Sequence, residues 1–380
     1  MTSAHALLSA SSSHRWLNCT PSARLEEALA DRGSVYASEG TAAHALGEHK
    51  LREFLKLPTQ KPISEFDSPE LNYYTDRYVE HVCELISEAY SRCNDPLVLI
   101  EQRLDYSHVV PQGFGTVDTL IVADQVLDVL DLKYGMVRVS AEENPQLKLY
   151  ALGALDMYGF FYDIQTVRLT ICQPRLDSIS VFELSVAELL HWADTELKPK
   201  AALAFKGEGE FSAGEHCRFC RARATCRARA ERNLELAKMD FKEPAMLTDD
   251  EIAEVLAKAE DLAAWAKAIW NHAEQAAINH DKHWAGYKLI EGTGKRKYSN
   301  ESNVAKAVLA TGQYKETQIY TKSLISLTAM EHLLGKKKFA EVLDGLWEKP
   351  PGKPKLVPKS HKKPEWNRNQ QAKNDFGGSF

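Results

Sequence analysis

The sequence of 380 residues lacks the features of several protein classes. It has no run of eighteen apolar residues and no basic segment followed by an apolar one at its start, so we expect neither a membrane span nor a signal peptide. It has no internal repeat, and residues 292–295 are too short to form a G-x-x-x-x-G-K-S/T phosphate loop. These absences favour a soluble globular protein without an ATP-driven motor.

Cysteine is scarce as well, with seven residues in the chain. The number is odd, and three of the seven form one short motif, Cys217-x2-Cys220-x5-Cys226. In a protein without a signal peptide this pattern favours a reduced compartment and a metal or cluster site over disulfide bonds. Cys19 is the candidate for a fourth ligand, and spacing alone allows either a zinc ion or an iron–sulfur cluster. The others are expected to be ordinary buried or half-buried thiols: Cys83, Cys93 and Cys172.

An overall excess of positive charge is absent too, since the formal net charge is −6. The charge is unevenly spread: residues 349–380 carry eight Lys and Arg against two acids, which leaves −12 for the residues before them. This stretch is rich in Pro, Lys and Asn and has no hydrophobic periodicity, so we expect a mobile basic tail. Such a tail would add non-specific DNA affinity or contact a partner protein.

Two acids and a lysine stand in an otherwise apolar hairpin. Residues 117–122 and 126–133 are rich in apolar, β-branched side chains and flank a two-residue turn, which predicts two antiparallel strands. With that turn, facing residues have numbers that sum to 249. Asp118 then faces Asp131 at roughly 4.5–5.5 Å, where like charges repel. Lys133 lies on the same face as Asp131, because side chains alternate along a strand.

This arrangement would make a poor core, but it suits a divalent cation that cancels the repulsion between the two carboxylates. The alternative is a surface hairpin whose polar face points into water. Four apolar residues share the face of the acids, so we expect this face to be partly buried, which favours the metal site: Leu120, Val122, Leu127 and Val129.

The segments around the hairpin predict a mixed α/β fold. A short N-terminal helix follows Ser11-Ser12-Ser13, which we expect to cap it. The main elements expected are helices over 38–57, 73–89 and 186–205, and strands over 97–104, 167–172 and 179–184. The resulting order of helix, three strands, helix and two strands is typical of a mixed sheet flanked by helices.

Four polar side chains on these elements are candidates for the same site. His44 lies on the helix 38–57, and Glu101 lies on the strand 97–104. Asn144-Pro145 is an N-cap followed by proline at the first helical position. The helix that begins there carries Gln146 and Tyr150 on one face, because they are four residues apart.

After residue 210 the chain becomes rich in arginine and then in helical patterns. Residues 218–232 contain six arginines and one acid, and residues 248–251 form a capping box that opens a long helix to about His280. Residues 284–348 resemble a small α+β unit that begins with a strand over 287–291. We therefore expect a core domain over 1–235, a helical segment over 236–283, an accessory domain over 284–348 and the tail over 349–380.

The candidate residues, taken in order, resemble a known family. They are similar to the four motifs of the RecB branch of the PD-(D/E)xK nucleases, over about residues 10–230: His44, Gly115-x-x-Asp118, Asp131-x-Lys133 and Gln146-x-x-x-Tyr150. The resemblance implies a restriction-endonuclease-like core, and the predicted order of elements agrees with it. Val117 replaces the proline of the named motif and Asp131 replaces its glutamate, and this branch tolerates both variants.

The resemblance also implies a role for each residue. A Mg²⁺ or Mn²⁺ ion would be held by His44, Asp118, Asp131 and the main-chain carbonyl of Leu132. Lys133 would orient or deprotonate the attacking water. Gln146 and Tyr150 would brace the site and the DNA backbone near it. Glu101 would support the site from the first strand.

The cysteines carry a second resemblance. One distant N-terminal cysteine with a C-x2-C-x5-C motif after the core is similar to the iron staple of AddB and of the CRISPR-associated RecB-like exonucleases. There, four cysteines hold a [4Fe-4S] cluster, which implies the same role for Cys19, Cys217, Cys220 and Cys226. Such a staple would close a loop of about two hundred residues, on the order of several kcal/mol by the loop-closure argument. A zinc ion held by the same four thiolates is the alternative.

Together these resemblances imply a metal-dependent DNA exonuclease, similar to the RecB-like nucleases of bacteriophages and prophages. It would act in the bacterial cytoplasm, away from membranes, in phage recombination or DNA processing, with a partner such as a single-strand annealing or single-strand binding protein. Four arginines would either track the DNA backbone or form a solvated helix face: Arg218, Arg221, Arg223 and Arg227. The alternatives are a structure-specific endonuclease and a catalytically idle DNA-binding or assembly module.

Overall fold

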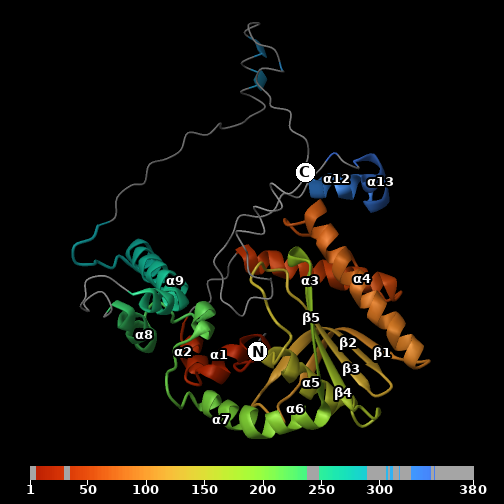
Figure 1. The fold of residues 1–380 in the computed structure, drawn as a ribbon, viewed down its shortest axis with the longest axis horizontal. Helices are drawn as coiled ribbons and strands as arrows, with labels where there is room; N and C mark the ends of the chain where they lie inside the picture. The colour runs from red at the N-terminus through yellow and green to blue at the C-terminus, as the bar shows by residue number, and fades with distance from the viewer. Residues whose placement is uncertain are drawn as a thin grey trace, which may run out of the picture.

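A computed structural model describes residues 6–29, 35–237, 248–288 and 327–343, together with 305–306, 309–310, 316 and 346. A twisted sheet lies at its centre with helices on both faces (Figure 1). Helices, three strands, a helix and two strands follow one another as predicted, which confirms the mixed α/β class. The predicted tail over 349–380 and most of the strand predicted over 287–291 lie outside the described residues.

The sheet has five strands in the spatial order β1-β2-β3-β4-β5. β3 and β4 pair in parallel, and each other neighbouring pair is antiparallel. Helix α5 (Pro145–Tyr158) connects the two parallel strands, because a tight turn cannot join strands that run the same way. The bounds of the strands are β1 Leu97–Asp105, β2 Phe114–Ala123, β3 Val126–Leu132, β4 Thr166–Gln173 and β5 Ser178–Ser185.

Two hydrophobic cores form, one on each face of the sheet. Helices α3 (Val35–Phe54) and α4 (Pro69–Arg92) cover one face, while α5 and α6 (Val186–Trp192) cover the other (Figure 1). Along β2, Leu120 and Val122 join the core under α5, whereas the residues between and after them, Ile121 and Ala123, join the core under α3 and α4. Alternation along a strand therefore decides which core a side chain enters.

The register of the central hairpin is the predicted one. Ala123 pairs with Val126 and Thr119 pairs with Leu130, so facing residue numbers sum to 249. The four apolar residues predicted to share the face of the acids are fully buried: Leu120, Val122, Leu127 and Val129. The predicted face is wrong for Asp118, because Val117 joins the core of Leu120 and Val122 while Asp118 meets His44 of α3 on the other side of the sheet.

Local capping signals open α5 and α9 (Asp249–His280), but the cap predicted for α1 (Ser13–Asn18) does not form. The Asn144 side chain accepts hydrogen bonds from the main-chain amides of Gln146 and Leu147, and Thr248 forms the predicted capping box. Ser12 occupies the N-cap position of α1 but makes no side-chain cap bond there. Its hydroxyl donates to the Ser9 carbonyl at 3.1 Å instead, so the predicted serine cap is wrong.

The single helix predicted over 186–205 is interrupted. α6 passes into a five-residue π-helical turn, Ala193–Leu197, which leads into α7 (Lys198–Lys206). Pro199 has no main-chain amide to donate to the preceding turn, and its ring crowds the carbonyl four residues earlier. A wider local turn relieves that clash without ending the helical run.

The remaining elements flank this core. α9 packs against α8 and the short helix η4, and α12 packs against α4. Among the described residues, no helix combines the length and apolar character that crossing a bilayer requires. The elements are η1 Ala10–Ser12, α2 Ser22–Glu27, η2 Pro174–Leu176, η4 Glu215–Phe219, α8 Arg227–Ala237, α9 Asp249–His280, α12 Leu327–Leu334 and α13 Lys336–Val342.

Candidate active site

Three acids form a row across three adjacent strands. The pairs on either side of Glu101, Ile100 with Thr119 and Gln102 with Val117, place Glu101 of β1 opposite Asp118 of β2. The β2–β3 pairing ends at Thr119 and Leu130, and Asp118 and Asp131 are the next residue along each strand. The two aspartates are only 8% and 3% exposed. Facing like charges repel, and burial strengthens that repulsion, so the row favours the binding of cations.

The backbone is distorted where this row crosses β1 and β2. Glu101 has φ +51°, which is uncommon for a residue other than glycine. Side-chain alternation also breaks here: Val117 and Leu120, three residues apart, enter the same core. A strained backbone of this kind marks places where a side chain is aimed at a site. Here, one ligand atom each from His44, Glu101 and Asp118 lies within 4.8 Å of the others.

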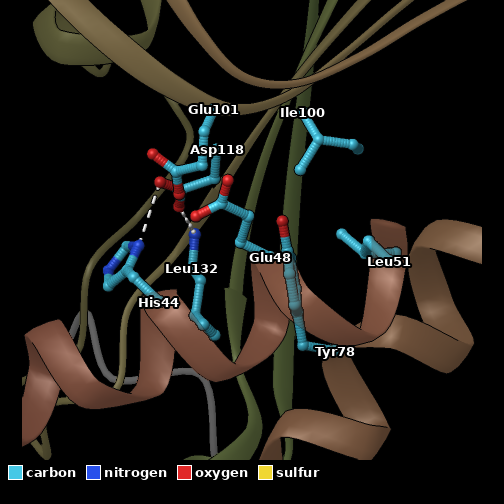
Figure 2. A pocket seen from close by; sticks show the side chains of 8 residues that line it. All are labelled: His44, Glu48, Leu51, Tyr78, Ile100, Glu101, Asp118 and Leu132. Carbon is cyan, nitrogen blue, oxygen red and sulfur yellow. Dashed lines mark hydrogen bonds and ion pairs between the residues drawn. The ribbon is translucent and has the colours of Figure 1, made fainter. Parts of the chain in front are cut away.

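His44 reaches Asp118 from helix α3. Its Nδ1 lies 2.9 Å from Asp118 Oδ1, and the main-chain amide of Leu132 donates to Asp118 Oδ2 at 2.6 Å (Figure 2). Burial lowers the pKa of His44, but the charge and hydrogen bond of Asp118, with the charge of Asp131, outweigh burial and raise it to about 9. Without a metal, His44 is therefore protonated at neutral pH and acts as the counter-ion of Asp118.

Asp131 is held from the side of α5. Gln146 Nε2 donates to its Oδ1 at 2.8 Å, and Lys133 Nζ lies 2.8 Å from its Oδ2. This second contact is a short ion pair, and the ammonium of Lys133 is the cation that lies beside the buried Oδ2. Burial, followed by the charge of Asp118, raises the pKa of Asp131 despite the ammonium of Lys133.

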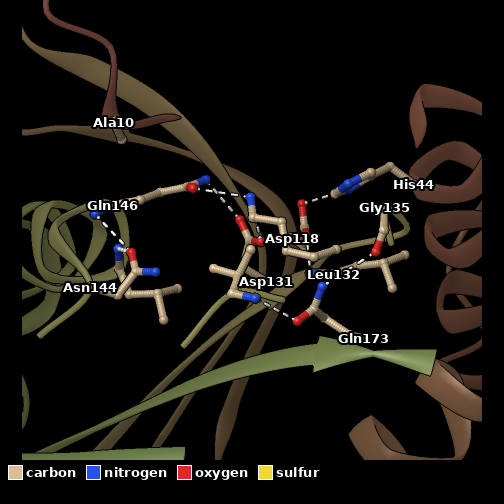
Figure 3. Close-up of polar contacts among 12 residues, drawn as sticks. Ala10, His44, Asp118, Asp131, Leu132, Gly135, Asn144, Gln146 and Gln173 are labelled. Carbon is tan, nitrogen blue, oxygen red and sulfur yellow. Dashed lines mark hydrogen bonds and ion pairs between the residues drawn. The ribbon is translucent and has the colours of Figure 1, made fainter. Parts of the chain in front are cut away.

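Gln146 and Tyr150 lie on the same face of α5, as their spacing predicted, and this face points toward Asp131. Lys133 Nζ donates to Gln146 Oε1 at 3.0 Å, and Gln146 Nε2 donates to Tyr150 Oη at 3.3 Å. Figure 3 shows the side chain of Gln146 reaching toward Asp131. A Cβ at Gly115 would stand 2.9 Å from Cε1 of Tyr150, so the first residue of the Gly115-x-x-Asp118 pattern must lack a side chain. Burial raises the pKa of Tyr150 well above its ordinary value, so the phenol stays protonated.

Glu48 belongs to the site, and no role was predicted for it. It lies one helical turn after His44 on α3 and lines the same pocket as Glu101 and Asp118 (Figure 2). Arg52 Nε donates to its Oε1 at 2.7 Å. Burial, followed by the charge of Asp118, raises the pKa of Glu101 to about 7, and Glu48 adds to that rise. The signal in the sequence was the i, i+4 spacing of His44 and Glu48.

The donor set fits a hard or borderline divalent cation. Carboxylate oxygens suit Mg²⁺, and an imidazole adds a preference for Mn²⁺. Asp131 Oδ2, buried without a hydrogen bond among the described residues, is a lone-pair donor that a cation would satisfy. The group within 4.8 Å contains Glu101, for which only a supporting role was predicted, and it does not contain Asp131. The acid on the first strand is thus more central than its sequence context indicated.

The structure also brings the four cysteines of the predicted staple together. Cys19, at the end of α1, lines one pocket with Cys217, Cys220 and Cys226, about two hundred residues later in the chain. Burial raises the pKa of the Cys220 thiol to about 12. Of the three cysteines expected to be ordinary thiols, Cys172 is buried and the others are half-buried: Cys83 and Cys93.

Two donors in this pocket point to a missing acceptor. Ser22 Oγ and Arg229 Nε both line it and are buried without a hydrogen-bond partner in the part of the chain that is described. A tetrahedral zinc site with Zn–S bonds of roughly 2.3 Å would bring its sulfurs to within about 4 Å of one another. Among the described residues, no three of the cysteine sulfurs lie within 4.8 Å of each other. The described thiols are therefore not arranged as a preformed tetrahedral zinc site.

The four arginines named for DNA binding have different surroundings. Arg221 is committed to α2, since its guanidinium donates to the carbonyls of Glu26 at 3.3 Å and Leu29 at 3.2 Å. Arg223 donates to the Cys220 carbonyl at 3.2 Å. All four are exposed, and the other two directly follow cysteines of the pocket in the sequence: Arg218 and Arg227.

Comparison with known proteins gives a family and a similar solved structure. A family model described as a protein of unknown function (DUF2800) matches residues 5–364. A solved structure titled "Crystal structure of SSO0001" is similar at 11% sequence identity. That similarity covers 57% of this chain and 96% of the other, with a TM-score of 0.22.

Proposed function

Since the chain belongs to the DUF2800 family of proteins of unknown function, we propose an activity from the chemistry of its site: a metal-dependent DNA exonuclease with a PD-(D/E)xK-type core. The observation that carries the proposal is the row of acids across β1, β2 and β3, with His44 at one side and Lys133 at the other. An imidazole, carboxylates and a lysine in this order on a mixed sheet are what metal-assisted phosphodiester hydrolysis requires.

Each residue has a task that its position supports. His44, Glu101 and Asp118 hold the cation, and Asp131 adds an oxygen from the neighbouring strand. When bound, Mg²⁺ or Mn²⁺ would neutralise phosphate oxygens and activate the attacking water. Lys133, 2.8 Å from Asp131 Oδ2, would orient that water as an ammonium, and would remove its proton only as a neutral amine. Gln146 and Tyr150 brace the two groups: their hydrogen bonds end on Lys133 and Asp131.

We further propose that the cysteine pocket holds a [4Fe-4S] cluster as a structural staple. The pocket has four thiols, two donors without an acceptor, and no zinc-like trio of sulfurs among the described residues. Three arginines line it, Arg15, Arg223 and Arg229, and their charge offsets the negative charge of four thiolates. A colourless protein with stoichiometric zinc would overturn the choice of iron.

The proposed setting is a bacterial cytoplasm. A phage or prophage nuclease of this kind would process DNA ends in recombination, with a single-strand annealing or single-strand binding protein as its partner. DNA binding would depend mainly on phosphate contacts, for which the exposed Arg218 and Arg227 lie beside the core.

The test is digestion of end-labelled linear DNA and of circular DNA with Mn²⁺, Mg²⁺ or EDTA. Wild type is compared with Asp131→Ala and with Asp124→Asn. Asp124 is the matched control because it is exposed in the turn of the same hairpin, with φ +56°, which asparagine adopts readily. We expect wild type and the control to degrade linear DNA only when a metal is present, and Asp131→Ala to be inactive.

Each of the other outcomes would support a different function for this protein. Nicked circles would mean a structure-specific or general endonuclease. Equal activity of wild type and Asp131→Ala would defeat the site assignment. Bound but uncleaved DNA with either metal would leave a catalytically idle DNA-binding module.

A further inference from the structure

The turn that follows Lys133 carries exposed apolar side chains next to the candidate site. Met136 is 59% exposed and Val137 is 39% exposed. Two residues separate Lys133 from Met136, so the turn directly follows the end of β3 that carries Asp131. A single exposed apolar residue is ordinary on a protein surface. What distinguishes this pair is how firmly its backbone is held.

A buried glutamine holds the turn from inside. Gln173, the last residue of β4, is 1% exposed. Its Oε1 accepts from the Val139 amide at 2.8 Å, and its Nε2 donates to the carbonyls of Val137 at 2.9 Å and Gly135 at 3.3 Å. Figure 3 shows Gln173 and Gly135 beside Leu132 and Asp131. The backbone polar groups are thus satisfied inward, while the apolar side chains of the turn are presented to solvent.

The surroundings of the turn suit a nucleic acid strand. Arg138, exposed next to Val137, supplies positive charge for a phosphate. Tyr134, which precedes the turn, is buried under Arg175, whose guanidinium carbon lies 5.0 Å from the ring centre. Tyr134 therefore fixes the base of the turn and does not contribute to its exposed surface.

We propose that residues 135–138 form the base-contacting wedge of the site. Met136 and Val137 insert beside the nucleobase next to the cleaved phosphate and separate it from its neighbour, as apolar wedges do in other DNA-binding proteins. The substrate class is then a strand end whose bases are unstacked at the site, and on a duplex end the wedge opens the terminal pairs. This inference rests on the proposed nuclease function and names its substrate.

Cleavage of two matched substrates tests the wedge. One is a blunt-ended duplex, and the other is the same duplex with four unpaired nucleotides at the cleaved end. The Met136→Ser/Val137→Ser variant should lose about tenfold in rate on the blunt end and no more than about twofold on the unpaired end, because unstacking is already done there. Ile179→Ser/Val181→Ser is the control, since both residues are 51% exposed on β5. Equal losses on the two substrates, or no loss on the blunt end, would overturn the wedge.

A binding measurement separates this inference from the proposed function. The DNA carries 2-aminopurine at the terminal base, and its fluorescence rises when the base is unstacked. In the Asp131→Ala background with Mg²⁺, the rise on DNA binding should disappear when Met136 and Val137 are serines. If wild type cleaves DNA and the rise is unchanged by the serines, the wedge fails alone. If wild type does not cleave but the rise depends on the two residues, the nuclease proposal fails and the wedge stands.

Gln173 is the positioning residue of the wedge. Gln173→Glu keeps the size of the side chain but loses the donors to Gly135 and Val137. It should reproduce the ratio of blunt-end to unpaired-end rates seen with the serine variant. A variant that slows both substrates equally would make Gln173 a general structural residue and would count against the turn.

Discussion

Single residues decide how charge is distributed in the site. The ammonium of Lys133 lies between Asp131 Oδ2 at 2.8 Å and Gln146 Oε1 at 3.0 Å, with its side chain 27% exposed. The ammonium is therefore held in one position beside the acids and remains accessible to water. A group held in this way is placed for proton transfer or for orienting a nucleophile, because two acceptors remove most of its rotamer freedom.

We predict that Lys133→Met retains DNA binding and loses cleavage. The loss should be about 10²–10⁴-fold, the usual size of a general acid–base contribution. Gel-shift affinity and rates of end-label release are the two measurements, with Lys198→Met, an exposed lysine on α7, as the matched control. A Lys133→Met enzyme within a factor of three of wild type would remove this residue from the mechanism.

The metal-free protein should become less stable as pH rises. Glu101 has a pKa raised to about 7 and His44 a pKa raised to about 9, both above their ordinary values. A raised pKa means that the folded state holds the proton more tightly, so the stabilisation is full at low pH and is lost as pH passes upward through the folded pKa. In EDTA, the melting temperature should therefore fall between pH 5 and pH 9.

His44→Gln should flatten the upper part of this curve, between about pH 6.5 and 9. Melting in EDTA at several pH values measures it, with the exposed His191→Gln on α6 as the control. The same slope in wild type and His44→Gln would mean that His44 carries no linked proton.

At this scale the sequence predicted most of the site but not its centre. The proximity of Asp131 and Lys133 follows from the alternation of β3, and the two-residue turn brings Asp118 to the level of Asp131. Alternation along β2 breaks between Val117 and Leu120, so strand periodicity did not predict that Asp118 faces His44. The position of Glu101 could not be derived in this way. Its φ of +51° breaks the regular geometry on which strand periodicity depends, and the break comes from packing among three strands. Local patterns do not contain that information.

Among the helices and strands, some were predicted from the sequence and others were not. Caps and hydrophobic periods predicted α5, α9 and the strands, because these signals lie within the element itself. The π-helical turn before α7 was missed, since it depends on how Pro199 is accommodated in a helix that continues on both sides. The attachment of α9 to the core was also beyond sequence patterns, because it depends on a buried arginine from another helix.

That arginine joins α9 to the cysteine pocket. Arg229, 1% exposed, lines the pocket and donates from Nη2 to Asp261 Oδ1 on α9 at 2.7 Å. Removing the carboxylate would leave a buried guanidinium without its charge partner, which is costly.

We predict that Asp261→Asn loosens α9 while the core stays folded. Hydrogen exchange over residues 250–275 should accelerate about tenfold, on the scale of a local opening whose free energy falls by about 1.4 kcal/mol. Glu254→Gln is the matched control on the same helix, where its partner is the exposed Lys258 at 2.9 Å. Unchanged exchange in Asp261→Asn would mean that other contacts hold the helix.

For the whole molecule, the cysteine pocket is the main long-range tie, because it joins α1 to η4 and the segment after it. We predict that Cys19→Ser lowers both the iron content and the melting temperature of anaerobically purified protein. The loss of stability should be on the order of several kcal/mol if the bound group closes the whole loop. Cys83→Ser, half-buried on α4, should change neither quantity. A brown, normally stable Cys19→Ser protein would exclude Cys19 as a ligand.

The tie also sets an order of events during synthesis. A ribosome releases Cys19 at the start and its three partners only after the entire sheet has been made, a delay of about 10–40 s at roughly 5–20 residues per second. The N-terminal helices already pack against α5 and α7 by then, so a nascent chain cut short before residue 226 can pair all five strands but cannot complete the pocket. With the proposed staple, maturation of this protein should therefore depend on the supply of the cluster at one late moment, when the core is already formed.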